Sequence, residues 1–377
     1  MKDITKIREN FPYLKTGKIY LNHAATGPII KPVKDKLIEV ISEKSETEID
    51  NFKKFLNSVE NTKLLLGELI NTSSERIAFV DNTSTGLNIL AQGIDWEKGD
   101  GIILNNLEFP ANVYPFLNLN DKGVEVDFVK SHKGIVTAEN IIDAIKPNTK
   151  LISLSMVQFL TGYRIDLEKI GKVCKEKNII FSVDAIQGLG AVRLNVQKCN
   201  VDFVSSGSQK WLFGLQGLGF IYLSERLQSK IKPTFVGWTS VENQWNLLNY
   251  DLILKKTAER FQTGTLNTLG IFALEESLKF LKNYGFDLVE KKVLDNSTYL
   301  MQLLNNLGIK TVLTNLPEEN IAGIVSFEHK NSSNIFNTLL ANNIICSIRE
   351  GMIRFSPHFY NLHEELEKVI KILAEVL

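Results

Sequence analysis

The sequence has few cysteines, no net charge and no long apolar run. Its 377 residues include 43 Lys and Arg against 43 Asp and Glu, so it lacks the positive field that attracts nucleic acid or an anionic membrane surface. Its three cysteines, Cys174, Cys199 and Cys346, are far apart and favour a reducing compartment, which we expect to be the cytoplasm. No run approaches the roughly 20 apolar residues that cross a bilayer, and the first 15 residues lack the apolar core of a secretory signal. We therefore expect a small-molecule partner, with no nucleic acid and no membrane.

Several catalytic motifs are missing as well. The five histidines show no HExxH spacing and the cysteines form no CxxC pair, so we expect no metal site. There is no GxGxxG turn after the first strand and no GxxxxGK[ST] loop, which disfavours a nicotinamide enzyme. The absence of GxSxG weakens the case for a serine hydrolase.

What the sequence does contain is a regular alternation of apolar runs and helical segments. Seven short β-branched runs lie between about residues 77 and 223: IAFV, GIILN, VEVDFV, LISLSMV, IIFSVD, DFVSS and GFIYL. This pattern predicts an α/β fold with a mainly parallel seven-stranded sheet. Ligands of such sheets bind beyond the carboxyl ends of the strands.

The pattern changes after about Leu269. Long amphipathic helices are expected over 271–284 and 286–306, strands over 321–327 and 344–348, and a last helix from about 362. We predict a large domain over 16–269 and a smaller α+β domain over 270–377, joined by an N-terminal segment, 1–15. Two such domains would form a cleft, a common place for a small-molecule site.

Two strand ends carry residues of opposite charge. Asp184 ends IIFSVD and Lys210 follows DFVSSGSQ, so both side chains should lie at the same edge of the sheet. Asp184 could simply cap a helix or pair with Arg193, and a lysine is most often a solvated surface charge. Together, however, they match what pyridoxal 5'-phosphate (PLP) requires, namely a lysine for its aldehyde and a carboxylate for its pyridine nitrogen.

A phosphate site is expected where IAFVDNTSTGLNIL turns from a strand into a helix. The hydroxyl groups and free backbone N–H groups from Asn82 to Thr85 would favour a dianion at the positive end of the helix dipole. An ordinary helix cap with no ligand is the alternative at this position.

These motifs resemble the fold type I PLP-dependent enzymes of the class V aminotransferase family, which includes cysteine desulfurases, selenocysteine lyases, isopenicillin N epimerases and kynureninases. The resemblance extends from YLNHAATGP to IRFSPHFYN, and the motifs occur in the family's order. It implies the PLP-dependent transferase fold type I. In its terms Lys210 forms the Schiff base and Asp184 pairs the pyridine nitrogen.

The same resemblance implies the remaining cofactor contacts. Ser84 and Thr85 would bind the phosphate, and Phe109 in LEFPANVYPF would stack on the ring. Gln187 in VDAIQGLG would bond the ring oxygen, which Gln158 in SMVQFLTG would also approach.

Substrate and subunit contacts are implied too. Arg349 in SIREG matches the arginine that holds the substrate carboxylate, Asn22 and His23 would line the entrance, and Arg354 would be structural. Thr265 in RFQTGTLNT would reach the partner subunit's phosphate, which implies a homodimer with shared active sites.

Two departures bear on the reaction. Desulfurases of this family carry a nucleophilic cysteine just after the carboxylate-binding arginine, whereas Arg349 is followed by Glu350, Gly351 and Met352. Gln209 stands before Lys210, where desulfurases usually have histidine and the alanine–glyoxylate aminotransferase branch does not. We therefore expect transamination of a small amino acid through an external aldimine. The alternatives are a cysteine or selenocysteine β-lyase and an amino-acid epimerase, with a non-catalytic binding module or an oxidoreductase as more remote classes.

Overall fold

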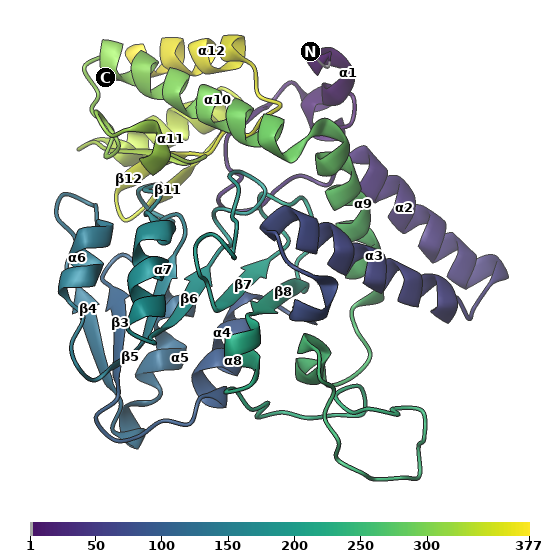
Figure 1. The fold of residues 1–377 in the computed structure, drawn as a ribbon. Helices are drawn as coiled ribbons and strands as arrows, with labels where there is room; N and C mark the ends of the chain where they lie inside the picture. The colour runs from purple at the N-terminus through teal and green to yellow at the C-terminus, as the bar shows by residue number, and fades with distance from the viewer. Residues whose placement is uncertain (1–2) are drawn as a thin grey trace.

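A seven-stranded sheet forms the centre of the computed structural model, which describes residues 3–377 (Figure 1). Its strands are β2 (Ile77–Val80), β3 (Gly101–Asn105), β4 (Glu125–Val129), β5 (Thr149–Ser155), β6 (Ile180–Asp184), β7 (Phe203–Gly207) and β8 (Gly219–Leu223). Their spatial order is β2-β8-β7-β6-β5-β3-β4. Each of the seven apolar runs forms one strand, which confirms the predicted α/β fold.

The sheet is parallel except at β8. Neighbouring pairs from β4 to β7 run in the same direction, whereas β8 is antiparallel to both β7 and β2. The carboxyl ends of the parallel strands therefore meet at one edge of the sheet, where ligands bind in open α/β sheets.

Helices cover both faces of the sheet because alternate residues of each strand point to opposite sides. The helices up to residue 230 are α1 (Ile4–Arg8), α2 (Lys31–Ser42), α3 (Phe52–Ile70), α4 (Thr83–Gly93), α5 (Tyr114–Leu117), α6 (Ala138–Asp143), α7 (Leu167–Glu176) and α8 (Glu225–Gln228). On one face, Leu104 of β3 belongs to the same core as Leu87 of α4. On the other, Phe181 of β6 belongs to a core with Ile170 of α7 and Leu66 of α3.

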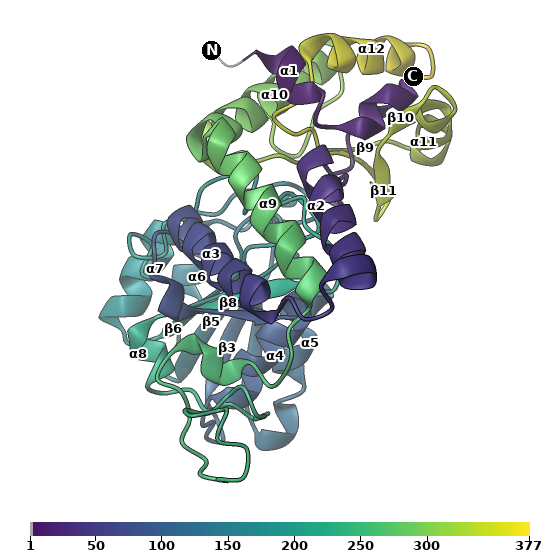
Figure 2. The ribbon, with the colours of Figure 1, turned by 90° about the vertical axis from the view of Figure 1, so that its right-hand side faces the viewer.

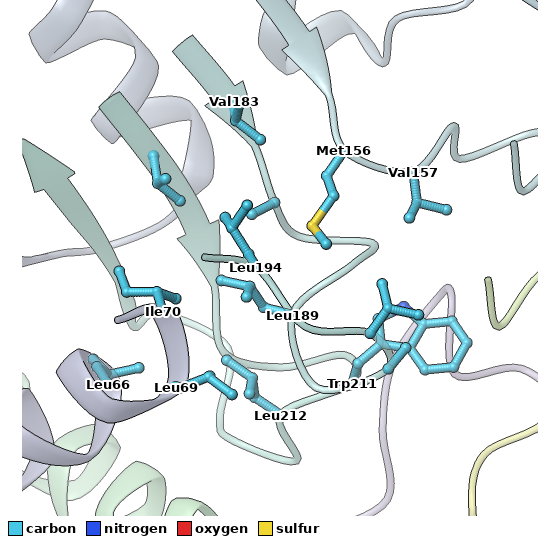
Figure 3. Packing of buried hydrophobic residues seen from close by; sticks show 14 of the residues in the cluster. Leu66, Leu69, Ile70, Met156, Val157, Val183, Leu189, Leu194, Trp211 and Leu212 are labelled. Atoms are coloured by element: carbon cyan, nitrogen blue, oxygen red, sulfur yellow. The ribbon is translucent and has the colours of Figure 1, made fainter. Parts of the chain in front are cut away.

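The core beneath α3 continues to the residues that follow β7. Figure 3 shows Leu66 and Ile70 of α3 on one side of this core, Leu189 and Leu212 towards the middle, and Trp211 on the far side. Trp211 is the residue after Lys210, so the backbone next to this lysine is fixed by core packing.

The C-terminal part is a smaller α+β unit, as predicted. It contains α9 (Thr268–Tyr284), α10 (Phe286–Asn306), β9 (Val325–Glu328), α11 (Ser332–Ala341), β10 (Ile344–Ile345), β11 (Ser347–Arg349), β12 (Met352–Phe355) and α12 (His363–Ala374). The strand expected over 321–327 begins only at Val325, and the one expected over 344–348 is divided at Cys346. Strands β11, β12 and β9 form one antiparallel sheet.

The N-terminal segment joins this smaller unit. Strand β1 (Ile19–Tyr20) pairs in parallel with β10, whereas the sequence pattern predicts these residues in the large domain. Figure 2 shows α1 beside α10 and α12 at one end of the molecule, while α9 runs down against α2 and α3. None of the helices formed by residues 3–377 has the length and apolarity that crossing a membrane requires.

Candidate active site

Asp184 and Lys210 lie together beyond the carboxyl edge of the sheet. Asp184 is the last residue of β6, and Lys210 follows the adjacent parallel strand β7 by three residues. Both line a cavity of about 340 Å³. The sequence prediction that two neighbouring strand ends bring these residues to one edge is therefore confirmed.

The Asp184 carboxylate is buried, with 2% of the residue exposed. Its Oδ1 accepts a hydrogen bond from the backbone N–H of Ile186 at 3.0 Å. Burial raises its pKa to about 7, and the negative charge of Glu108 adds to this, whereas Lys210 opposes it. Arg193, the alternative partner considered from the sequence, pairs instead with Asp287 at 3.7 Å.

Lys210 combines a lowered pKa with access to the cavity. Burial lowers the pKa of its amine to about 8; Asp184 opposes this shift, and the cations Arg354 and Arg349 reinforce it. Its Nζ lies 5.9 Å from the centre of the Phe109 ring. A lysine of this kind has a large neutral fraction near pH 8, and the neutral amine is the nucleophile that attacks an aldehyde.

The N-terminus of α4 forms another wall of the cavity. Asn82 caps the helix through its Oδ1, which accepts from the backbone N–H of Thr85 at 2.9 Å. Thr83 and Ser84 both line the cavity, and the expected binding of a phosphate by Ser84 stays a prediction. Thr83 belongs to the segment 82–85 that the sequence predicts at a phosphate, and its hydroxyl oxygen is buried and bonds to no described residue.

Thr85 and Thr265 do not line the cavity of Lys210. Both line a separate hollow of about 240 Å³ between the N-terminal end of α4 and the loop before α9, rather than the cavity of Lys210. Thr265 is exposed. The expected roles of these two threonines at a phosphate stay predictions.

Aromatic side chains flank the mouth of the cavity. Phe109 is 46% exposed and meets Phe159 edge to face, with ring centres 5.2 Å apart and planes at 79°. Both residues line the cavity. Phe109 is therefore placed where a flat ring bound in the cavity could stack on it.

A buried carboxylate, Glu108, which no sequence motif indicates, fixes the segment before Phe109. Glu108 accepts hydrogen bonds from the side chain of Asn112 at 2.9 Å, from the backbone and hydroxyl of Ser155 at 2.9 and 2.5 Å, and from the amides of Asn105 and Gln158 at 2.5 and 3.2 Å. Gln158 is thus engaged beside Glu108 and is not among the residues that line the cavity. Its side-chain oxygen is buried without a partner in the described chain.

Two arginines from the β11–β12 hairpin reach the cavity. Arg349 is exposed, and its Nη1 donates to the carbonyl of Ile348 at 2.8 Å. Arg354, expected to be structural, is only 2% exposed and also lines the cavity. Its Nε donates to the hydroxyl of Ser347 at 3.2 Å and its Nη1 to the carbonyl of Phe159 at 2.6 Å.

Arg354 has no acidic partner among residues 3–377. Burial is the main cause that lowers its pKa to about 10, and Arg349 adds to it. A buried guanidinium without a carboxylate is costly, so this group is suited to receive the carboxylate of a ligand. The signal in the sequence was an arginine inside the apolar run MIRF.

The other residues expected near the cofactor fall into two groups. Gln187 lines the cavity. His23 instead lies in the core, fully buried, and its Nδ1 and Nε2 are bonded to the carbonyl of Ser356 and the hydroxyl of Tyr360, each at 2.8 Å. Asn22 is partly buried, with its side-chain oxygen unbonded in the described chain. Neither of these two residues lines the cavity at Lys210.

The chain matches the family Aminotransferase class-V over residues 19–369 and belongs to it. Membership confirms the expected class of enzyme, a PLP-dependent class V aminotransferase or a related lyase. A probable cysteine desulfurase of Methanothermobacter thermautotrophicus is 27% identical, with 98% of this chain and 97% of that protein covered.

Solved structures share the fold. A cysteine desulfurase from Thermococcus onnurineus superimposes with a TM-score of 0.89 at 23% identity, covering 100% of this chain and 98% of that one. The cystine C–S lyase C-DES, in complex with its product cysteine persulfide, gives 0.86 at 22% identity, with 97% and 99% covered. Another C-DES structure carries glycine linked to its PLP cofactor. These names describe desulfuration and C–S cleavage, and they do not support the transamination expected from the sequence.

Proposed function

We propose that this chain is a PLP-dependent C–S lyase that removes sulfur from a cysteine-like amino acid and forms no persulfide on its own cysteines. The names of its relatives supply the substrate class. The hairpin that follows Arg349 carries the second part of the proposal, because it replaces the loop on which desulfurases of this family hold a nucleophilic cysteine.

This hairpin is tight and contains no cysteine. Arg349 and Met352 are register partners, so only Glu350 and Gly351 connect β11 to β12. Both connecting residues have positive φ, 46° and 79°, as a two-residue hairpin turn of type I′ requires. No side chain of this turn could accept sulfur.

The three cysteines do not take over that role. Burial raises the pKa of Cys174 and Cys346 to about 12 and that of Cys199 to about 11. The thiolate is the nucleophilic form of cysteine, and none of the three lines the cavity. We therefore expect the sulfur to be released as part of a product, with no transfer to a cysteine of the chain.

The cavity residues fit PLP. Lys210 would bond the aldehyde, Asp184 would pair the ring nitrogen, and Phe109 would cover the ring. Ser84, with the free N–H groups of the first turn of α4 and the hydroxyl of Thr83, which has no partner among residues 3–377, would hold the phosphate. When bound, PLP supplies the electron sink for reactions at the α-carbon of an amino acid.

The substrate carboxylate would bind to Arg354. This guanidinium is buried in the cavity wall and has no acidic partner in the described chain, whereas Arg349 is exposed and screened by water. Arg349, the residue expected from the resemblance, would add a second positive charge at the mouth.

Lys210 would move the proton. Its amine, with a pKa near 8, can take the α-proton as a general base, and Gln209 beside it does not titrate. The Cβ–S bond then breaks, and sulfur leaves with the electron pair. The overall reaction consumes one water and yields pyruvate, ammonia and one sulfur product, which is a thiol, sulfide or persulfide. It needs no oxidant.

A homodimer would complete the site. An apolar hollow of about 550 Å³ lies where the end of α2 leads into the start of α3; its lining includes the exposed side chains of Ile41, Ile49 and Phe52, and also Thr265. A second copy of the chain seated there would cover this apolar surface and bring its own Thr265 loop towards the cavity. Light scattering of the purified protein tests the dimer.

The reaction is tested with the holoenzyme and with cysteine or cystine. We expect pyruvate and reduced sulfur in equal amounts, with no alanine formed. Cys174→Ala, Cys199→Ala and Cys346→Ala variants should each retain this activity. Alanine formation with a persulfide on one cysteine would identify a desulfurase instead. Conversion of alanine or glutamate to an oxo acid, with no sulfur released from cysteine or cystine, would identify a transaminase.

A further inference from the structure

Trp211 makes a hydrogen bond to a cavity residue from within the core. It follows Lys210 directly and is fully buried. Its indole Nε1–H donates to Oε1 of Gln187 at 3.0 Å. Gln187 lines the cavity, so this bond links the core to the proposed cofactor site.

The two neighbours of Gln187 leave its amide a single orientation. An indole N–H can only donate and a backbone carbonyl can only accept. Nε2 of Gln187 donates to the carbonyl of Ala24 at 3.0 Å, while Oε1 accepts from Trp211. If the amide were flipped, its N–H donors would face the indole N–H of Trp211, and its oxygen would face the carbonyl oxygen of Ala24. The nitrogen therefore lies on the side of Ala24, which also lines the cavity, and it carries a second N–H.

Trp211 is itself held firmly in place. A Cβ added to Gly323 would lie 2.3 Å from its ring, so the ring packs directly on that glycine. Nε2 of His358 lies 3.1 Å from its backbone carbonyl, and the ring of His23 stacks on it with centres 5.8 Å apart. The indole N–H cannot turn away from Gln187 without disturbing these contacts.

We propose that Trp211 is a positioning residue that fixes the Gln187 amide so that an N–H, rather than the oxygen, faces the ring oxygen of the cofactor. The inference rests on the proposed function, because it requires PLP in the cavity. It assigns a role to Trp211 that the family resemblance does not.

The consequence is electrostatic. An N–H donor stabilises negative charge on the ring oxygen, so it favours the deprotonated form of the lysine-bound cofactor. Without Trp211 the amide could rotate and present its oxygen to the ring oxygen. The lysine-bound cofactor would then keep its proton up to a higher pH. One hydrogen bond to a charged group corresponds to a shift of about one pH unit in the midpoint of the visible absorption change.

The test is a pH titration of the visible spectrum of the holoprotein. Trp211→Phe removes the indole N–H and should raise the midpoint by about one pH unit, while lowering the affinity of the apoprotein for PLP. Gln187→Leu should raise it similarly, and Trp211→Phe should add nothing in that background. Trp96→Phe is the matched control, because it removes an indole hydrogen bond to the Ala91 carbonyl away from the cavity and should leave the midpoint unchanged.

A second substitution separates positioning from packing. Replacing Trp211 by benzothienylalanine keeps the shape of the ring and substitutes sulfur for the N–H, so it should reproduce the shift even if Trp211→Phe fails to fold. An unchanged midpoint in this variant would overturn the inference and leave the proposed function intact. A wild-type protein that binds no PLP would overturn both.

Discussion

Asp184 on β6 and Ser205 on β7 are register partners in adjacent parallel strands. The Asp184 carboxylate and the loop that carries Lys210 therefore leave the sheet at the same edge, and their charges interact. Burial lowers the pKa of Lys210 to about 8, and the negative charge of Asp184 keeps it from falling further. The reactivity of the lysine is thus set jointly by its burial and by its neighbour.

This coupling predicts how the apoprotein combines with PLP. Only the neutral Lys210 amine attacks an aldehyde, so the rate should rise about tenfold per pH unit below pH 8 and level off above it. Asp184→Asn removes the charge that raises the Lys210 pKa, so the rate should level off at a lower pH. Stopped-flow absorbance measures both curves. A rate that continues to rise towards pH 10.5, the ordinary pKa of lysine, would contradict the prediction.

The Lys210–Asp184 pair was predictable from the sequence because strand ends are local features. Seven apolar runs define the strands, and parallel neighbours place their carboxyl ends together whatever the loops do. The N-terminus of α4 was predictable for the same reason, since Asn82 to Thr85 combine a cap with hydroxyl groups within four residues.

Other parts of the site depend on contacts between distant segments. Glu108 accepts hydrogen bonds from Asn105, Asn112, Ser155 and Gln158. No spacing of residues in the sequence predicts this network. His23 is polar and follows a strand, yet the small unit packs over it. Long-range packing, rather than local pattern, decides such positions.

The two arginines predict different kinetic effects. Arg354→Gln removes a buried cation and should raise KM for the amino acid about 30- to 150-fold, which is the loss of a charged hydrogen bond worth about 2–3 kcal/mol. Arg349→Gln removes an exposed, screened charge and should raise KM less than about tenfold. Steady-state kinetics with cysteine measures both. The reverse order would restore Arg349 as the principal carboxylate ligand.

Cysteamine is the control substrate for this comparison, because it carries the amine and the sulfur but no carboxylate. Neither substitution should weaken its binding by more than about twofold. An equal loss for cysteamine and cysteine would show that Arg354→Gln had distorted the cavity as a whole.

Glu108 predicts a large loss of stability for a small chemical change. Glu108→Gln keeps the size of the side chain but turns an N–H donor towards groups that themselves donate, so buried hydrogen bonds to Ser155 or Asn112 are lost. We expect the free energy of unfolding to fall by about 2–3 kcal/mol. Glu176→Gln, on the exposed face of α7, should change it by less than about 0.5 kcal/mol. Urea unfolding compares the two, and equal effects would contradict this reading.

Two buried histidines predict acid sensitivity. The rings of His23 and His358 lie 5.0 Å apart, both fully buried. Burial lowers the pKa of His23 to about 3 and that of His358 well below 6.5. In the unfolded chain both take up protons below about pH 6.5, whereas in the fold they stay neutral. Stability should therefore be full above pH 6.5 and decline as the pH falls below it, by about 1.4 kcal/mol per pH unit for each histidine.

The contribution of one histidine can be isolated by substitution. His23→Gln lowers stability at every pH because hydrogen bonds to Ser356 and Tyr360 are lost, but it removes one titrating group. Its free energy of unfolding between pH 6 and pH 4 should therefore fall less steeply than that of the wild type, by about 1.4 kcal/mol per pH unit. His132→Gln, on the surface, is the control for the loss of a histidine as such. Parallel slopes for His23→Gln and the wild type would mean that His23 is protonated within the fold.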